Sequence, residues 1–451
     1  MDDSLPIDPD AAALRVDRLT RLLGLGALAL LAATWKLWTP QDVFPRVPLF
    51  YWAPPRWLDW FSLGIMVAGL IGLLIHRRIP ERRLAATLTA CGFALQFIAD
   101  QHRLQPWAWQ FFILALVIAL ADDRTILGGW RWLVISIYAY SALSKFDAAF
   151  LSETGPQLLQ PLLQTTSYRR PWSLSQVDQI LQIVMPYASA MLPIGEAVVA
   201  ILLAISSLRR LGLFFSWLMH LSLLAILGPL GLNHSWGVFL WNVFFIFQNW
   251  NLFAFRLGRP ADRLSTRLTA NTSSRVAKCV LGAVYLWPAL YPWGCCDAWL
   301  GWAVYAPLHE EVVALIEVEP LDSSSSMPME LKRSFGRLDF GLGTNLPPFV
   351  GTRELVLNHW SLRTVGAPSY PEARFQSAVA LALLREGHVT RLELVVKSRP
   401  SRWTKLVQTR TRMSSISEIW NYAGTFWFNA YPECVYRRLP GERGDVSPPG
   451  D

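Results

Sequence analysis

The sequence predicts an all-α polytopic membrane bundle of about nine transmembrane helices, followed by a C-terminal exoplasmic α+β domain. Apolar runs of about 20 residues, the length that crosses a bilayer as a helix, recur as far as Trp293. Only 16% of the 451 residues are charged, whereas soluble domains carry about a quarter. After about Ala306, patterns typical of strands replace the apolar runs. These observations exclude a soluble enzyme, a coiled coil and a disordered chain.

The predicted spans are separated by short connections, and tryptophans at many of their ends are typical of the aromatic belts of membrane interfaces. The third and fourth spans are short, which allows a tilted, merged or partly re-entrant path. Hydropathy places the nine spans near Arg21–Trp38, Trp57–His76, Leu84–Ile98, Trp107–Ala121, Trp130–Phe146, Tyr187–Ser206, Leu211–Leu230, Trp236–Phe253 and Ala277–Trp293.

The formal net charge is +8, but the arginines lie in short loops rather than along one face. This distribution argues against a nucleic-acid partner and for the lipid bilayer. Arginines are concentrated in alternate loops, such as Arg77, Arg78, Arg82 and Arg83 after the second span. Because such loops face the cytoplasm, we expect a multi-pass protein of a bacterial-type inner (plasma) membrane, with its N-terminus inside and its C-terminal domain outside.

The chain is expected to have four parts. The N-terminal part lacks the apolar stretch of a signal peptide. In the outer domain, Glu311–Val318 and Arg391–Lys397 alternate like strands, and Gln376–Arg385 has helical spacing. The parts are a cytoplasmic N-terminal segment (1–20), the transmembrane bundle (21–305), the exoplasmic α+β domain (306–440) and a disordered tail (441–451).

Ionisable side chains are costly in hydrocarbon, so each one within a span needs a reason. Lys145 lies at the outer end of the fifth span, two residues before Asp147. One interpretation is a lysine that reaches toward the interface and pairs with Asp147 or with a neighbouring helix. The other is a partly desolvated lysine that acts as a general base. Lys145, Asp147 and His220 are the catalytic candidates.

Three further polar groups lie within apolar spans. Glu196 has no basic partner in its own span, so it must meet Lys145, His220 or an arginine of another helix, be protonated, or face water. A lone buried histidine such as His220 most often bonds across helices, and Asn242 is expected to bond inward. We expect these residues to form the polar centre of the bundle, toward the outer leaflet. Their spacing is not that of metal ligands, so no metal site is predicted.

The outer loop between the third and fourth spans is dense in polar and aromatic residues, including His102, Arg103 and Gln105. One interpretation is that it lines a site held over a rigid scaffold. The alternative is an interfacial cap whose tryptophans belong to the aromatic belt.

Three cysteines are predicted on the outer side of the membrane. Cys295 and Cys296 end the ninth span, and Cys434 lies in the outer domain. We expect a disulfide between Cys434 and one of the pair, which would tie the domain to the membrane. The alternative is a redox-active pair formed by Cys295 and Cys296.

The stretch from Ser141 to Leu151, with Lys145 and Asp147, resembles the segment that holds the catalytic lysine in vitamin K-dependent γ-glutamyl carboxylases and in the wider horizontally transferred transmembrane (HTTM) family. Glu196, the Arg-Arg pair that follows it, and the helix with His220 are also similar to that family, over roughly residues 15–305. The resemblance implies a quinol-linked enzyme in which Lys145 deprotonates a hydroquinone, Asp147 orients it and His220 lies near the polar centre. In that family, oxygen then makes the quinol a stronger base, which prepares a glutamate for carboxylation.

The chain departs from that family in several places. It has Gln105-Pro106-Trp107 where the carboxylases carry an Asn-Asn-His run, Ser144 in place of the first lysine of a doublet, and a much shorter outer domain. Phrases such as Gly228–Trp236 also resemble DoxX and MauE membrane proteins, which are associated with thiol or quinone redox partners. The leading hypothesis is a carboxylase-like membrane enzyme that acts at the outer face on a quinol or an exported protein. The alternative is a non-catalytic membrane module whose outer domain binds, or helps to mature, an exported partner.

Overall fold

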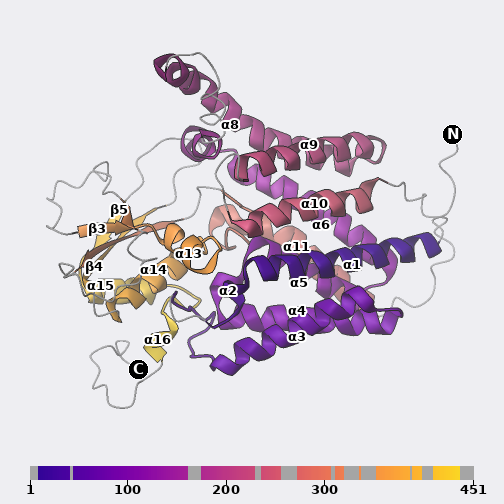
Figure 1. Cartoon of the computed structure of the whole chain (residues 1–451), viewed down its shortest axis with the longest axis horizontal. Helices are drawn as coiled ribbons and strands as arrows, with labels where there is room; N and C mark the ends of the chain where they lie inside the picture. The colour runs from indigo at the N-terminus through magenta and orange to yellow at the C-terminus, as the bar shows by residue number, and fades with distance from the viewer. Residues whose placement is uncertain are drawn as a thin grey trace.

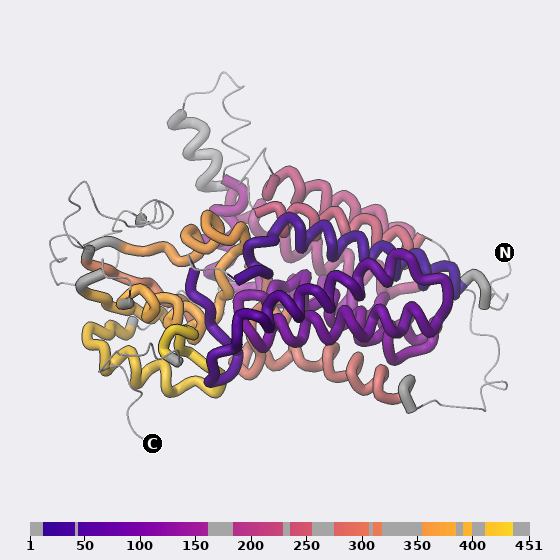
Figure 2. Tube along the Cα trace, turned by 60° about the horizontal axis from the view of Figure 1, so that its bottom comes forward, coloured from indigo at the N-terminus to yellow at the C-terminus, as the bar shows by residue number. Residues whose placement is uncertain are grey.

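The computed structural model describes residues 9–40, 44–160, 174–228, 235–254, 272–305, 310–318, 335–336, 352–385, 389–398 and 410–436. Long helices run side by side in one bundle, and a small sheet with its own helices is docked at one end of it (Figure 1). A second view shows the same two parts (Figure 2). Helix α1 begins at the end of the bundle opposite to this domain (Figure 1). The predicted tail, 441–451, lies outside the described residues.

Helices occupy the positions of the predicted spans. The third and fourth predicted spans are continuous helices. The first and sixth begin earlier than hydropathy indicated, and the first begins within residues 1–20, the predicted cytoplasmic N-terminal segment. The ninth gives way to a 3₁₀ turn, η4 (Trp287–Trp293). The bundle helices are α1 (Pro9–Ala33), α2 (Trp35–Trp38), α3 (Arg56–Ile75), α4 (Ile79–Ala99), α5 (Pro106–Leu120), α6 (Asp123–Lys145), α8 (Leu174–Ala204), α9 (Arg209–Leu227), α10 (Trp236–Phe253) and α11 (Thr272–Leu286).

Within the described residues, three helices are long and apolar enough to cross a membrane, at Arg56–Ile75, Val184–Ala204 and Ser206–Leu227. Helix α5 is apolar but has only 15 residues. Helix α6 carries charged side chains along its length, including Arg131 and Lys145. The spans beyond these three therefore stay a prediction.

Local sequence explains where several helices begin. The Asp122 carboxylate accepts a hydrogen bond from the Thr125 backbone N–H at 2.9 Å and so caps α6. Pro106 occupies the first turn of α5, where backbone N–H groups have no acceptor within the helix, so its missing N–H costs no hydrogen bond. The Glu81 carboxylate accepts the N–H groups of Arg77 and Arg78 at the start of α4.

Helices α3 and α4 pack closely because each presents a glycine to the other. A Cβ atom on Gly92 would lie 2.5 Å from the Cβ of Met66, and one on Gly69 would lie 2.6 Å from the backbone nitrogen of Thr89. Small residues at such crossings let two backbones approach, which is a main source of helix association in membranes.

The C-terminal domain is a five-stranded antiparallel sheet in the order β2-β3-β1-β4-β5, with helices against one face. The prediction of strands at Glu311–Val318 and Arg391–Lys397 is confirmed, and the predicted helix corresponds to α14 and the turn η6. The elements are β1 (Glu311–Val318), β2 (Phe335–Gly336), β3 (Thr352–Leu355), α13 (Leu357–Val365), α14 (Ala373–Ala382), η6 (Leu383–Arg385), β4 (Val389–Lys397), β5 (Arg410–Met413), α15 (Ile416–Ala423) and α16 (Glu433–Tyr436).

The domain and the bundle share one hydrophobic core. Strands β1 and β4 pair so that Ala314 faces Leu394, and their buried alternate residues pack with α14. The same cluster of buried side chains continues into the bundle, where it includes Trp38 and Trp107. The domain is therefore packed onto the helices rather than suspended beyond them.

We predict that Gly92→Val destabilises the protein by at least about 2 kcal/mol, because its side chain overpacks the α3–α4 contact. The matched control is Gly64→Val on α3, since nothing lies within 4 Å of a Cβ at that position. Thermal unfolding of both variants in the same detergent, followed by tryptophan fluorescence, measures the difference. Equal melting temperatures for the two variants would contradict this account of the packing.

Candidate functional site

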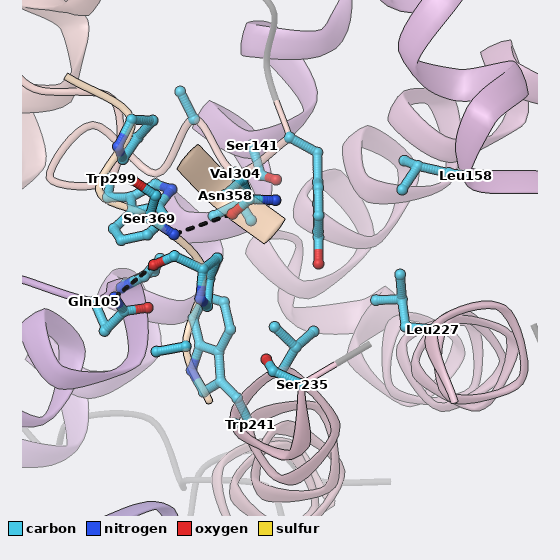
Figure 3. A pocket seen from close by; sticks show the side chains of 18 of the residues that line it. Gln105, Ser141, Leu158, Leu227, Ser235, Trp241, Trp299, Val304, Asn358 and Ser369 are labelled. Atoms are coloured by element: carbon cyan, nitrogen blue, oxygen red, sulfur yellow. Dashed lines mark hydrogen bonds between the residues drawn. The ribbon is translucent and has the colours of Figure 1, made fainter. Parts of the chain in front are cut away.

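A cavity of about 390 Å³ lies where the bundle meets the domain. Figure 3 shows Gln105, Trp299 and Ser369 on one side of this space and Leu158 and Leu227 on the other. The polar lining residues from the bundle include Thr34, Gln105, Tyr138, Ser141, Lys145, Glu196, His220, Ser235 and Asn242. Those from the domain are Glu311, Glu354, Asn358, Ser369 and Gln376. The domain thus forms one wall of the cavity.

The cavity contains a buried ion pair between α6 and α8. The Lys145 ammonium lies 2.9 and 3.0 Å from the two carboxylate oxygens of Glu196. Ser141, one turn before Lys145, accepts a hydrogen bond from the ammonium and donates one to Glu196 at 3.0 Å. The Lys145 side chain is 6% exposed and that of Glu196 is 14% exposed, so the pair is largely withdrawn from water. Of the alternatives that the sequence left open for Glu196, the structure shows the contact with Lys145.

Helical spacing explains why these groups lie together. Tyr138, Ser141 and Lys145 are at positions i, i+3 and i+7 of α6, and such residues share one face of a helix. Tyr138 and Ser141 were not among the predicted site residues, although this spacing is visible in the sequence.

Asp147 does not occupy the place expected from its two-residue separation from Lys145. Helix α6 ends at Lys145, and the following residue leaves the helical path. The Asp147 carboxylate instead accepts a hydrogen bond from the Phe150 backbone N–H at 2.7 Å, at the start of the turn η2 (Phe150–Thr154). The carboxylate at the ammonium is that of Glu196, so of the two partners that the sequence allowed for Lys145, the neighbouring helix is correct and Asp147 is not.

A second network crosses the bundle beside the ion pair. The Tyr138 hydroxyl lies 2.6 Å from His220 Nε2, and His220 Nδ1 lies 2.8 Å from Asn242 Oδ1. The amide of Asn249, a residue that the sequence analysis missed, donates to Tyr138 at 2.6 Å and also to Ser216 at 2.6 Å. The expectation that His220 bonds across helices and that Asn242 bonds inward is confirmed.

The network assigns the proton on His220. Asn242 uses its amide nitrogen to donate to the Val238 carbonyl at 2.9 Å, so its oxygen faces His220 as an acceptor. His220 therefore donates from Nδ1 and accepts the Tyr138 hydroxyl proton at Nε2. This neutral imidazole lines the same cavity as Lys145 and Glu196.

The loop between α4 and α5 joins the bundle to the domain. The His102 imidazole Nε2 lies 3.0 Å from both the Pro368 carbonyl oxygen and the Ser361 hydroxyl, and Gln105 also donates to Pro368. Gln105 and the adjoining Trp107 line the cavity. The first interpretation of the loop is therefore correct for this part of it, and Trp107, which is 3% exposed, is not part of an interfacial belt.

Arg103 does not line the cavity and instead belongs to a charge cluster that the sequence analysis missed. Its guanidinium lies 2.5 Å from the carboxylate of Asp59, which also pairs with Arg46, and Asp59 is fully buried. Arg103 also donates to the Leu37 carbonyl at 3.0 Å. Two cations on one carboxylate, with carbonyls taking the remaining donors, are a structural arrangement that fixes the loop. An aspartate in the first turn of an apolar helix was the signal for it.

The predicted disulfide is not formed, since Cys295 and Cys296 carry free thiols. Cys434 follows Glu433, whose N–H donates to the Arg46 carbonyl at 2.8 Å, whereas Cys296 packs against Tyr291 and Ala298. The partners therefore contact different parts of the bundle. Burial raises the pKa of the Cys296 thiol, which disfavours the thiolate that a redox-active pair requires.

His102 predicts a pH dependence of stability. Burial lowers the pKa of His102 to about 4 from its ordinary value of 6.5. Between these two pH values the unfolded chain binds a proton and the folded chain does not, so the protein loses stability as the pH falls. Asp100 acts in the opposite direction, because burial raises its pKa to about 6. We expect His102→Gln, which keeps a neutral donor, to gain about 2 kcal/mol relative to the wild type between pH 7 and pH 5.

Unfolding of the two proteins across this pH range, followed by tryptophan fluorescence, measures the gain. The control is His359→Gln, because His359 lies on the exposed side of α13 and should show a smaller effect. Parallel stability curves for His102→Gln and the wild type would contradict the burial of a neutral imidazole at this joint.

No family model, curated protein or solved structure matches this chain. Its function is therefore inferred from the cavity and from the side chains that line it.

Proposed function

We propose that this chain is a polytopic inner-membrane enzyme that moves a proton from a quinol-type, lipid-soluble substrate in the cavity at its outer face. In this proposal the bundle crosses the membrane about nine times, with the N-terminus in the cytoplasm and the C-terminal domain outside. The three apolar helices support a membrane location, and the domain and the start of α1 lie at opposite ends of the bundle (Figure 1).

The buried Lys145–Glu196 pair, facing a cavity, is the observation on which the proposal depends. Ionisable groups within a membrane bundle are rare and are usually functional. Burying an ion pair rarely adds stability over an apolar pair of similar volume, so stability alone does not explain its presence. The pair also lines a cavity of about 390 Å³, whereas Arg46 and Arg103 of the Asp59 cluster border only about 20 Å³ of free volume and donate to carbonyl oxygens.

The size and lining of the cavity fit a quinol ring. Its volume lies within the range of sites for small molecules. Trp241, Trp299 and Phe245 supply aromatic surface, and the apolar lining includes Leu192 and Leu227 from α8 and α9. A flat ring with a hydroxyl at its edge can stack on the aromatic surface and present that hydroxyl to the charged pair.

The pair can accept a proton in two steps. Lys145 first passes a proton to Glu196 over 2.9 Å, which leaves an amine next to a neutral acid. The amine then takes the proton of the substrate hydroxyl, and the resulting ammonium stabilises the oxyanion that forms. His220, through the Tyr138 hydroxyl, provides a second neutral acceptor at the same cavity. Lys145 acts here together with Glu196 rather than with Asp147.

The shared core favours this enzyme over the non-catalytic module. A domain that only captured exported proteins would need no polar residues facing into the bundle, yet Asn358 and Ser369 line the cavity beside Lys145. Carboxylation of glutamate in an exported protein is the narrower form of the proposal and rests on the family resemblance.

Replacing Lys145 by arginine tests the proposal. Arginine retains the charge that Glu196 needs but does not release a proton. With the full chain in lipid nanodiscs and a short-chain naphthohydroquinone as probe, we expect the wild type to bind the quinol and to accelerate its oxidation by air. Lys145→Arg should slow this by about 10²-fold or more while binding changes less than threefold. Oxygen uptake measures the rate, and quenching of tryptophan fluorescence measures binding.

Two controls accompany this variant. Lys36→Arg changes an exposed lysine at the outer end of the bundle and should leave the rate unchanged. Glu196→Gln should lower the rate as well, since it removes the acceptor of the Lys145 proton. The proposal fails if Lys145→Arg oxidises the quinol at the rate of the wild type.

If cells lacking the chain have a phenotype and Lys145→Arg cells do not, the binding module is favoured. Absence of γ-carboxyglutamate from exported proteins, checked by mass spectrometry, would remove only the narrower form.

A further inference from the structure

Exposed aromatic side chains are concentrated around the start of α3, from two distant parts of the chain. Helix α3 contributes residues of its first two turns, the preceding loop contributes three, and the segment between α15 and α16 contributes two. Trp427 in this last segment is 97% exposed. The members of this aromatic rim are Phe50, Tyr51, Trp52, Trp57, Trp60, Phe61, Trp427 and Phe428.

The domain part of the rim is fixed to the bundle part. The Tyr51 hydroxyl donates to the Phe426 carbonyl at 3.0 Å, and the ring centroids of Phe50 and Phe428 lie 6.4 Å apart. The Asn429 N–H also donates to the Leu49 carbonyl at 3.2 Å. We call the segment Phe426–Phe428 the tip. These contacts hold the Phe426–Phe428 tip at the level where α3 begins.

The level at which α3 begins is the expected boundary of the hydrocarbon core of the membrane. Helix α3 is one of the three helices that are long and apolar enough to cross a membrane. Trp57, Trp60 and Phe61 are at positions i, i+3 and i+4 of it, and all three are exposed. Aromatic residues at the end of an apolar span typically lie among lipid headgroups. The Phe426–Phe428 tip is attached to the loop that leads into this helix.

We propose that the Phe426–Phe428 tip inserts into the headgroup region of the outer leaflet beside α3, so that lipid as well as the bundle holds the domain. The occupant of the rim is a phospholipid surface, because the rim includes the exposed aromatic residues at the start of the apolar helix α3 and consists of the residue types that membrane interfaces favour. This site does not depend on the chemistry at Lys145. It gives the domain that closes the cavity an attachment to the bilayer.

A photoreactive benzoylphenylalanine in place of Trp427 tests the proposal in the full chain. The protein is placed in nanodiscs of phosphatidylcholine and phosphatidylglycerol, irradiated, and analysed for lipid adducts by mass spectrometry. The same residue in place of Trp57 is the positive control. The negative control is Ile416, an exposed apolar side chain on α15, which lies farther from the bundle than α16 (Figure 1). We expect lipid adducts at positions 427 and 57, at least tenfold above position 416.

Adducts at 427 no more frequent than those at 416 would overturn the proposal, as would adducts with another protein or with a second copy of the chain. A second measurement avoids the bulky probe. Trp427→Phe keeps an aromatic ring, so the fluorescence difference between wild type and variant reports Trp427 alone. Brominated lipids should quench this difference by at least half. A difference signal that brominated lipids leave unchanged would place Trp427 in water and overturn the proposal.

Discussion

Charged side chains buried within an apolar helix bundle must be paired, and in this protein the partners come from distant parts of the chain. Lys145 of α6 meets Glu196 of α8, and Asp59 of α3 meets Arg103 from the loop after α4. Both pairs lie near the end of the bundle to which the domain is docked, and the domain closes the cavity that Lys145 faces. Docking and charge burial therefore depend on each other.

Paired charged side chains also hold the domain against the bundle. Arg374 of α14 forms an ion pair with Asp297, which follows the last bundle helix, and its Nε donates to Gln101 at 2.7 Å. One guanidinium thus joins the domain, the segment that leads into it and the loop between α4 and α5. The domain boundary predicted at residue 306 reflects a change in composition, whereas the packing boundary lies earlier, because Asp297 already bonds to the domain. The composition of a segment indicates whether it prefers water or an apolar environment. Its packing depends on residues elsewhere in the chain, which no local sequence pattern contains.

The sequence was sufficient to predict most of the helices and the two longest strands, because apolar periodicity follows directly from burial. It was also sufficient to select Lys145, Glu196, His220 and Asn242, since polar groups in apolar spans are conspicuous, and the structure brings all four to one cavity. Of the two partners that the sequence allowed for Lys145, Asp147 is the wrong one, because residues two apart on a helix do not face each other and α6 ends before Asp147. The residues that the domain contributes, such as Asn358 and Ser369, could not be predicted, because only the docked fold brings them to the cavity.

The cavity walls combine two kinds of polar network with different consequences. Beside the titratable groups, Trp241 donates to the Gln110 oxygen at 2.8 Å, and Gln110 donates to the Gln248 oxygen at 3.0 Å, which also accepts from Trp130 at 3.0 Å. Amides and indoles neither gain nor lose protons near neutral pH. This network therefore fixes the Trp241 ring in the wall through bonds that proton transfer does not alter. The surface on which a flat substrate would stack keeps its geometry whichever of Lys145, Glu196 or His220 holds the proton.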